Sequence, residues 1–551
     1  MQQKKFSDLD TAWHSAFGRL TGGLSPAALM IASFDWGLHV LGSPAKQLEL
    51  FRQAATPEPQ PSENEETVDT RFQDPAWSDF PYNVFRNTFL AQQAWWDSAT
   101  REVKGVDPRH LRIVNFAARQ MLDMASPSNF MMTNPVVLSR TRETMGANLL
   151  QGARNWLTDF NHLMSGSRER HPDYVVGETL AVTSGVVVFR NELMELIRYA
   201  SRTPRQYPEP ILIVPAWIMK FYILDLSPQN SVVKYLLDQG FDVYVISWKN
   251  PESEDAQFGM QDYVDLGVRA AMAHVQAAGA ERLHGVGYCL GGTLLAIVAS
   301  ALACEGDRKL ATVSLLASQV DFSEPGELGL FINESQVSFL EDLMNAQGFL
   351  RAEQMAGAFQ ILRSNDLIWS RVIRHYLLGE RTAMNDLMAW NADSTRLPAR
   401  MHSEYLRRLF LDNELSRGQY EVDGKPVALS DIRQPIFCLA TESDHVSPWD
   451  SVYKLLLLTD TDVDFVLTNG GHNGGVLSEP GHPGRHFRTR FKSEKDCHLA
   501  ASEWFREAPL TEGSWWPVWT AWLEKYSGTP VAPRKSPEIS LGPAPGRYVF
   551  G

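Results

Sequence analysis

The spacing of hydrophobic residues changes near Tyr174 of this 551-residue chain. Before that point, apolar and aromatic residues recur mainly at helical spacing. After it, short runs rich in β-branched residues alternate with helical stretches, which is typical of a mainly parallel sheet covered by helices. The pattern therefore predicts a mainly helical N-terminal domain over residues 1–175 and an α/β domain over residues 176–551. A stretch rich in Pro and Glu predicts a flexible linker at about residues 54–69.

The strands of the predicted sheet are separated by one long interruption. Between Val320 and about Ser430 the chain is helical in character and rich in Leu, Met and Trp, and no strand is expected there. An insertion between two strands of a sheet is interpreted as a helical cap, and caps of this kind often control access to a site. The strands are predicted at Val182–Phe189, Ile211–Val214, Val243–Ser247, Leu283–Tyr288, Val313–Ala317, Ile436–Ala440 and Asp464–Leu467.

The run Gly287-Tyr288-Cys289-Leu290-Gly291-Gly292 stands between a predicted strand and a predicted helix. A strand, a sharp glycine-lined turn and a helix form the nucleophile elbow of the α/β-hydrolase fold, here with cysteine in place of serine. Glycine neighbours suit a strained turn, and the helix N-terminus favours a thiolate. Cys289 is therefore the predicted nucleophile of an acyl transfer that passes through a thioester.

A thiol nucleophile needs a base, and the base needs an orienting group. In this fold the acid and then the histidine follow the nucleophile, each after a strand. Asp444 follows the strand at 436–440, and His472 lies in a glycine-rich loop after the strand at 464–467. Cys289, Asp444 and His472 are the predicted catalytic residues. The alternatives are His445 as the base, and Glu442 or Asp450 as the acid.

An oxyanion hole needs two N–H donors. One is expected from Leu290, the residue after the nucleophile. The other is expected from the loop after the strand at 211–214, where either Trp217 or Ile218 could donate. Lys220 in the same loop could meet an anionic substrate, but it could equally lie on a solvated face.

Composition excludes several classes of function. The net charge of −14 argues against nucleic acid as a partner. The four cysteines show no metal-ligand spacing and suit a reducing compartment, so no metal is expected. No signal peptide and no transmembrane segment are expected, because the longest apolar run falls short of the ~20 residues that span a bilayer. A cytoplasmic location is predicted.

Several motifs resemble those of the polyhydroxyalkanoate synthases over nearly the whole chain. The elbow resembles the cysteine lipase box of that family. The other matching segments are 127–130, 133–135, Lys220–Leu226, Ser247–Pro251, Asn365–Trp369, Trp390–Asp393, Asp444–Trp449, Gly471–His472 and Gly513–Pro517.

The resemblance implies a function that the residues alone do not. Enzymes of this family load the acyl group of (R)-3-hydroxyacyl-CoA onto the cysteine, release CoA and extend a polyester. Asp444 would then orient His472 or help to activate the 3-hydroxyl of the incoming unit. His445 becomes a candidate contact for CoA, and Lys220 and Trp390 are further candidate substrate contacts.

The resemblance also implies partners and location. It implies a single-subunit synthase that works as a homodimer at the surface of polyester granules and needs no cofactor, since coenzyme A arrives as part of the substrate. The motifs favour short acyl chains, although medium chains stay open. The competing interpretations are a cysteine-type thioesterase or polyester depolymerase of the same fold, and a non-catalytic granule-coating protein.

Overall fold

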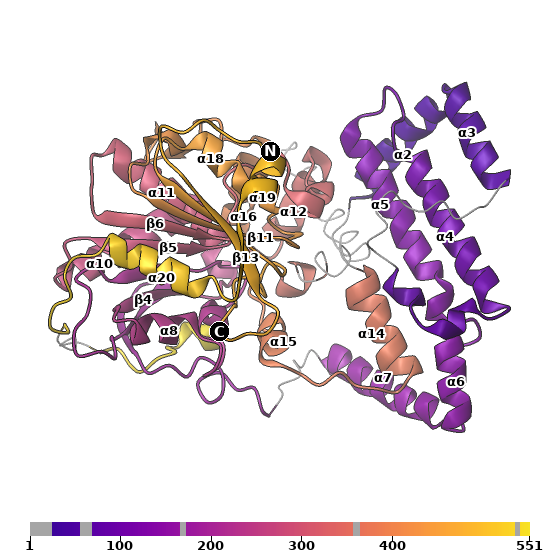
Figure 1. The fold of residues 1–551 in the computed structure, drawn as a ribbon, viewed down its shortest axis with the longest axis horizontal. Coiled ribbons are helices and arrows are strands. Elements are labelled where there is room, and N and C mark those ends of the chain that lie inside the picture. Colours follow the sequence, from indigo (N-terminus) through magenta and orange to yellow (C-terminus); the bar gives the residue numbers. More distant parts are fainter. Residues whose placement is uncertain (1–24, 56–68, 166–171, 356, 358–363, 535–539) are drawn as a thin grey trace, which may run out of the picture. The chain divides into compact units, whose positions relative to one another are not determined.

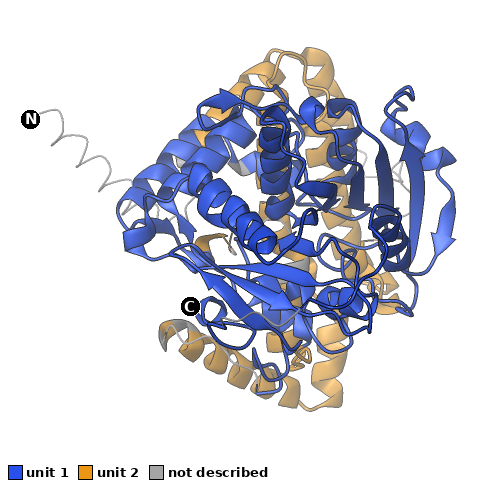
Figure 2. Cartoon of the chain, turned by 90° about the vertical axis from the view of Figure 1, so that its left-hand side faces the viewer, with its two compact units in different colours: residues 1–17, 170–353, 385–551 blue, residues 18–169, 354–384 orange. Residues whose placement is uncertain are grey.

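The computed structural model describes residues 25–55, 69–165, 172–355, 357, 364–534 and 540–551. The chain forms two compact units, which Figure 2 shows in blue and orange. Unit 1 takes the described residues within 170–353 and 385–551, and unit 2 takes those within 18–169 and 354–384. The described residues within 354–384, expected in the cap of the α/β domain, thus pack with the N-terminal helices. Most of the predicted linker lies outside the described residues.

Unit 1 is built on a ten-stranded sheet. Its six central strands are parallel, and an antiparallel pair completes each edge. This confirms the α/β-hydrolase class of fold. In spatial order the strands are β1 (Val186–Arg190), β2 (Met194–Tyr199), β4 (Val243–Trp248), β3 (Ile211–Val214), β5 (Leu283–Tyr288), β6 (Leu310–Leu316), β11 (Ile436–Thr441), β12 (Val463–Thr468), β13 (His486–Lys492) and β14 (Leu510–Glu512).

The sequence pattern missed three strands at the edges of the sheet, β2, β13 and β14. Charged residues interrupt the hydrophobic pattern of β2, but the structure buries them in ion pairs. The Arg190 guanidinium pairs with Glu195, and Arg198 Nη2 lies 2.9 Å from Asp242 Oδ2. The insertion also holds two short strand pairs where none was expected: β7 (Phe349–Leu350) with β8 (Leu397–Pro398), and β9 (Glu421–Val422) with β10 (Lys425–Pro426).

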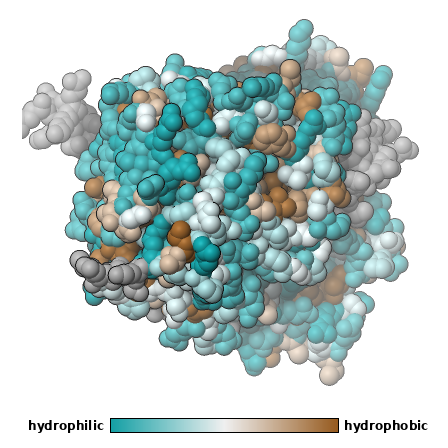
Figure 3. All heavy atoms as spheres, turned by 60° about the vertical axis from the view of Figure 1, so that its left-hand side comes forward, coloured by the Kyte–Doolittle hydropathy of each residue, from teal (hydrophilic) through white to brown (hydrophobic). Residues whose placement is uncertain are grey.

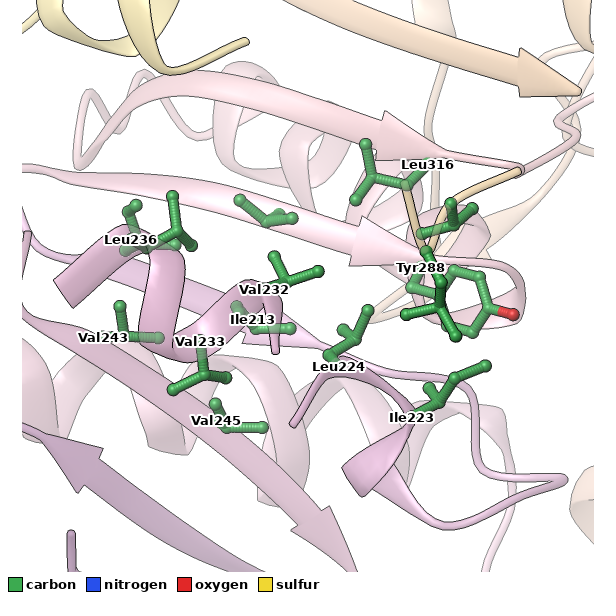
Figure 4. Packing of buried hydrophobic residues seen from close by; sticks show 14 of the residues in the cluster. Ile213, Ile223, Leu224, Val232, Val233, Leu236, Val243, Val245, Tyr288 and Leu316 are labelled. Atoms are coloured by element: carbon green, nitrogen blue, oxygen red, sulfur yellow. The ribbon is translucent and has the colours of Figure 1, made fainter. Parts of the chain in front are cut away.

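Helix α11 (Leu290–Cys304) begins directly after the elbow, and its residues 290–302 are all buried. Such a uniformly apolar helix belongs inside a core. Figure 4 shows the neighbouring core, where Val232, Val233 and Leu236 of α8 (Val232–Asp238) belong to the same buried cluster as Ile213 of β3, Val243 and Val245 of β4 and Tyr288 at the end of β5. The other α-helices of unit 1 are α9 (Met260–Asp262), α10 (Ala270–Ala277), α12 (Glu334–Asn345), α15 (Asp386–Asn391), α16 (Ala399–Glu404), α17 (Trp449–Tyr453), α18 (Leu455–Leu458), α19 (Ala501–Glu507) and α20 (Trp516–Lys525).

Unit 2 is helical, as the sequence predicted, and Figure 1 shows its segment α14 next to α7. Side chains of α7 hold the inserted segment through its backbone: Asn148 Nδ2 donates to the Leu377 carbonyl at 2.8 Å, and Asn155 Nδ2 donates to the His375 carbonyl at 2.9 Å. These long-range bonds explain why residues 364–384 belong to this unit. Its α-helices are α2 (Pro26–Leu41), α3 (Pro44–Ala55), α4 (Tyr82–Ala99), α5 (Pro108–Ala125), α6 (Pro135–Glu143), α7 (Ala147–Ser165) and α14 (Ser370–Val372).

Within the described residues, no helix combines the length and apolar character needed to cross a bilayer. The face seen in Figure 3 is mainly hydrophilic, with hydrophobic residues scattered over it.

Candidate active site

The elbow predicted around Cys289 is present and strained. Cys289 joins β5 to α11 with φ of 53° and ψ of −125°, a conformation that residues with a side chain rarely adopt. A Cβ on Gly291 would lie 2.0 Å from the carbonyl oxygen of Val214, at the end of β3. A Cβ on Gly287 would lie 2.3 Å from the Cα of Gly292. The glycines therefore let the backbone pass close enough to present Cys289 at the carboxyl edge of the sheet.

Asp444 and His472 meet as the sequence predicted. His472 Nδ1 lies 2.7 Å from Asp444 Oδ2, and the Asp444 side chain is fully buried. The opposite oxygen, Oδ1, accepts hydrogen bonds from the backbone N–H groups of Val446 at 2.9 Å and Ser447 at 2.8 Å. Thr441 Oγ1 also donates to Oδ2 at 3.1 Å. The carboxylate is thus fixed by four donors, and one of them is the imidazole.

The three alternative residues are placed elsewhere. Glu442 faces His486, with 3.7 Å between Oε2 and Nε2. Asp450 is exposed, and its Oδ1 accepts from the backbone N–H of Ser451. His445 is also exposed, which leaves its proposed contact with CoA open. Only Asp444, of the acids considered, is joined to His472.

Charge at the site favours transfer of the Cys289 proton to His472. Burial alone would lower the pKa of His472, but the Asp444 carboxylate and the hydrogen-bonded Cys289 sulfur raise it well above its usual value. Burial would likewise raise the pKa of Asp444, but His472 and the two backbone N–H groups hold it below its usual value. The site is therefore suited to stabilise an imidazolium beside a carboxylate.

The expected oxyanion donors lie on two segments that meet at the elbow. Leu290 is the first residue of α11, so its N–H has no acceptor within the helix. The loop after β3 is held by the insertion: Thr395 Oγ1 donates to the Trp217 carbonyl at 2.6 Å, and the Thr395 N–H donates to the Ile218 carbonyl at 3.2 Å. The choice between Trp217 and Ile218 as second donor stays a prediction.

Lys220 and Trp390 are both buried, and their expected contact with substrate stays a prediction. Only 3% of each residue is exposed. The Lys220 ammonium donates to the Gly551 carbonyl at 2.9 Å, and Trp390 Nε1 donates to the Lys220 carbonyl at 2.8 Å. Both residues hold the loop after β3 through these hydrogen bonds to the protein. Sequence alone could not distinguish a buried cation with protein partners from a solvated one.

The structure adds side chains that the sequence analysis did not single out. Tyr288, just before the nucleophile, donates its hydroxyl to Asn473 Oδ1 at 2.5 Å, just after the histidine. Tyr405 of the insertion is buried, and its pKa is raised by burial and by the nearby charge on Cys289. Tyr405 opens a π-helical turn, Tyr405–Leu411, of the kind frequent at functional sites. The position of Tyr288 in the elbow was the one available signal for it.

The arrangement supplies the parts of covalent acyl transfer. A thiol, an imidazole, an orienting carboxylate and an N–H at a helix start lie at the carboxyl edge of one sheet. Within the described residues, no cluster of three or more His, Cys, Asp or Glu side chains could hold a metal ion.

Known protein families match several parts of this chain. A family described as "Poly-beta-hydroxybutyrate polymerase (PhaC) N-terminus" matches residues 68–236, and one described as "Poly-beta-hydroxybutyrate polymerase N terminal" matches residues 4–46. The family described as "alpha/beta hydrolase fold" matches residues 209–475, which include Cys289, Asp444 and His472.

Curated relatives cover most of the chain. It is 38% identical over 491 residues to a poly(3-hydroxyalkanoate) polymerase of Methylorubrum extorquens, covering 88% of this chain and 80% of that one. It is 35% identical to poly(3-hydroxyalkanoate) polymerase 2 of Ectopseudomonas oleovorans, with coverage of 88% and 86%. It is 34% identical to the poly(3-hydroxyalkanoate) polymerase subunit PhaC of Cupriavidus necator, with coverage of 87% and 83%. With its elbow, its sheet and these similarities, the chain belongs to the poly(3-hydroxyalkanoate) polymerase family.

Proposed function

We propose that this chain makes poly(3-hydroxyalkanoate) from (R)-3-hydroxyacyl-CoA, with the acyl group held as a thioester on Cys289 and CoA released. The chain is an acyl-transferring enzyme by its family, and polyester synthesis is the activity that its relatives' names state. The observation that carries the cysteine mechanism is the elbow: Cys289 has a φ of 53°, its sulfur is hydrogen-bonded to His472, and Nδ1 of His472 lies 2.7 Å from Asp444 Oδ2.

In the loading step, Nε2 of His472 takes the proton of the Cys289 thiol, because Nδ1 is committed to Asp444. The sulfur bonds to the thioester carbonyl carbon, and negative charge develops on the carbonyl oxygen near the Leu290 N–H. The bond from that carbon to the CoA sulfur then breaks. The CoA sulfur leaves with the proton from His472, so one thioester replaces another.

In the elongation step, the 3-hydroxyl of the next unit attacks the acyl group on Cys289. His472 takes the hydroxyl proton, the new ester bond forms, and the bond to the Cys289 sulfur breaks. The sulfur regains the proton from His472. Asp444 acts here through His472, since Thr441, Val446 and Ser447 occupy its other acceptor positions.

Competition with water decides between a polymerase and a hydrolase, because both use the same acyl-enzyme. Tyr405 of the insertion is buried and close enough to Cys289 for the charge there to raise its pKa, and we propose that the insertion limits access of water to the thiol. We further propose that the enzyme works without a cofactor, as a homodimer in the cytoplasm, at the surface of the granules that its insoluble product forms.

The test uses purified chain with (R)-3-hydroxybutyryl-CoA. Free CoA is measured with a thiol reagent in quenched samples, and the acyl product is sized in the same reaction. Release of CoA together with high-mass polyester supports the proposal, and Cys289→Ala should release none. Release of CoA with only free 3-hydroxybutyrate would identify a hydrolase instead. If no CoA is released, the same assay with a medium-chain 3-hydroxyacyl-CoA tests the preferred length, and failure there refutes the proposal.

A further inference from the structure

The backbone after His472 is held by side chains from distant parts of unit 1. We call residues 469–478 the histidine loop. Its last five carbonyls each accept a hydrogen bond from a side chain outside the loop. Arg485 Nη2 donates to Gly474 at 2.5 Å and to Leu477 at 3.2 Å, Trp515 Nε1 donates to Gly475 at 3.0 Å, Trp516 Nε1 donates to Val476 at 3.0 Å, and Ser514 Oγ donates to Ser478.

These bonds replace those that regular secondary structure would supply. The histidine loop lies outside helices and strands over 470–478, and four of its ten residues are glycines, which leave the backbone free to take many conformations. Buried carbonyls without partners would also cost free energy. The two tryptophans restrict the backbone and supply donors to its buried carbonyls. Their rings can do so because they are almost completely buried, with 0% of Trp515 and 1% of Trp516 exposed.

We propose that Trp515 and Trp516 are positioning residues for catalysis, whose indole N–H groups fix the histidine loop so that His472 stays aligned with Cys289. The inference rests on the proposed function, in which His472 is the base. It gives the motif Gly513–Pro517 a role, because Trp515 and Trp516 each donate to a carbonyl that lies 40 residues earlier in the chain. The tryptophans act through the backbone of Gly475 and Val476 and touch no reacting atom.

A purely structural role is the alternative, and the chain offers a matched control for it. Trp519 lies on α20, one helical turn after Trp515, and is also fully buried. Its Nε1 donates at 3.0 Å to Ser314 Oγ in β6 rather than to the histidine loop. Replacing any of these three tryptophans with phenylalanine removes one indole donor and part of one buried ring.

The experiment compares Trp515→Phe, Trp516→Phe and Trp519→Phe in the full chain. CoA release gives kcat and KM, and thermal unfolding gives stability. We expect kcat to fall about tenfold in the first two variants with KM nearly unchanged, the rate equivalent of one buried hydrogen bond. Trp519→Phe should lose similar stability but keep its kcat. Should the large rings prove essential for folding, Ser514→Ala removes a smaller donor to the same loop and is expected to lower kcat in the same way.

The second readout is the rate at which iodoacetamide alkylates Cys289. This rate is measured across pH by mass spectrometry of the peptide that contains Cys289. It reports proton transfer to His472 without polymerisation. The Trp515 and Trp516 variants should shift the pH profile toward that of His472→Gln, and the Trp519 variant should match the wild type. If all three tryptophan variants behave alike, the positioning role is wrong while the proposed function stands. If His472→Gln itself leaves the profile unchanged, both are overturned.

Discussion

Replacing Asp444 with asparagine should move the ring proton of neutral His472 from Nδ1 to Nε2. The hydrogen bonds around residue 444 determine this outcome. The backbone N–H groups of Val446 and Ser447 both donate to Oδ1 and cannot turn away. The amide of Asn must therefore keep its oxygen at that position and place its NH₂ group at the position of Oδ2. That NH₂ group then donates to Nδ1 of His472, where the carboxylate oxygen accepted at 2.7 Å.

The consequence is a histidine with its proton on the wrong nitrogen. With Nδ1 accepting, Nε2 carries the hydrogen and cannot take the proton of the Cys289 thiol. A wrong tautomer of this kind costs about 10³- to 10⁴-fold in rate, which is about 4–6 kcal/mol of activation free energy. The buried site should keep its shape, since the two side chains have nearly the same size.

The assay measures the two chemical steps separately. Single-turnover CoA release gives the loading rate, and the growth of polymer on preloaded enzyme gives the elongation rate. Both should fall together in Asp444→Asn, because both need His472 as the base. Glu442→Gln is the control, since that carboxylate lies in the same loop but faces His486 at 3.7 Å. Normal loading with lost elongation would refute the reasoning and show that Asp444 acts on the substrate hydroxyl.

Three further substitutions test other parts of the site and core. Gly291→Ala places a Cβ 2.0 Å from a backbone carbonyl at the end of β3, so it should displace the elbow and lower kcat by about 10²-fold, whereas Gly37→Ala, with open space around its Cβ, should not. Burial lowers the pKa of His284 to about 3, below the value of about 6.5 for the unfolded chain. Its contribution to stability is therefore complete above about pH 6.5 and is lost as the pH falls, by about 1.4 kcal/mol per unit. Denaturant unfolding from pH 7 to 4 should show a shallower loss in His284→Leu than in the wild type, and equal slopes would contradict this. Tyr288→Phe leaves the Asn473 amide oxygen without its donor, so kcat should fall about tenfold, and adding Asn473→Leu should recover part of it; additive losses would show that the two residues do not act together.

The sequence by itself determined the parts of this protein that depend on neighbours along the chain. The central strands at 211–214, 283–288 and 436–440 were predicted because a buried parallel strand is a short, continuous apolar run. The elbow was predicted because a strained turn between a strand and a helix needs glycines at fixed positions. The order of Cys289, Asp444 and His472 follows from the same connectivity.

Only the tertiary structure decided what depends on residues far apart in the chain. The four donors around Asp444 identify it, rather than Glu442, as the carboxylate that pairs with His472, although both carboxylates follow the same strand. The strand β2 escaped prediction because its charged residues are neutralised by partners on other segments. The role of Trp390 in supporting the loop after β3 became visible only in the folded chain, where it is buried and its indole N–H donates to the Lys220 carbonyl. Hydrophobic spacing records the local face that a segment buries, but the partner of a polar group is set by the folded chain.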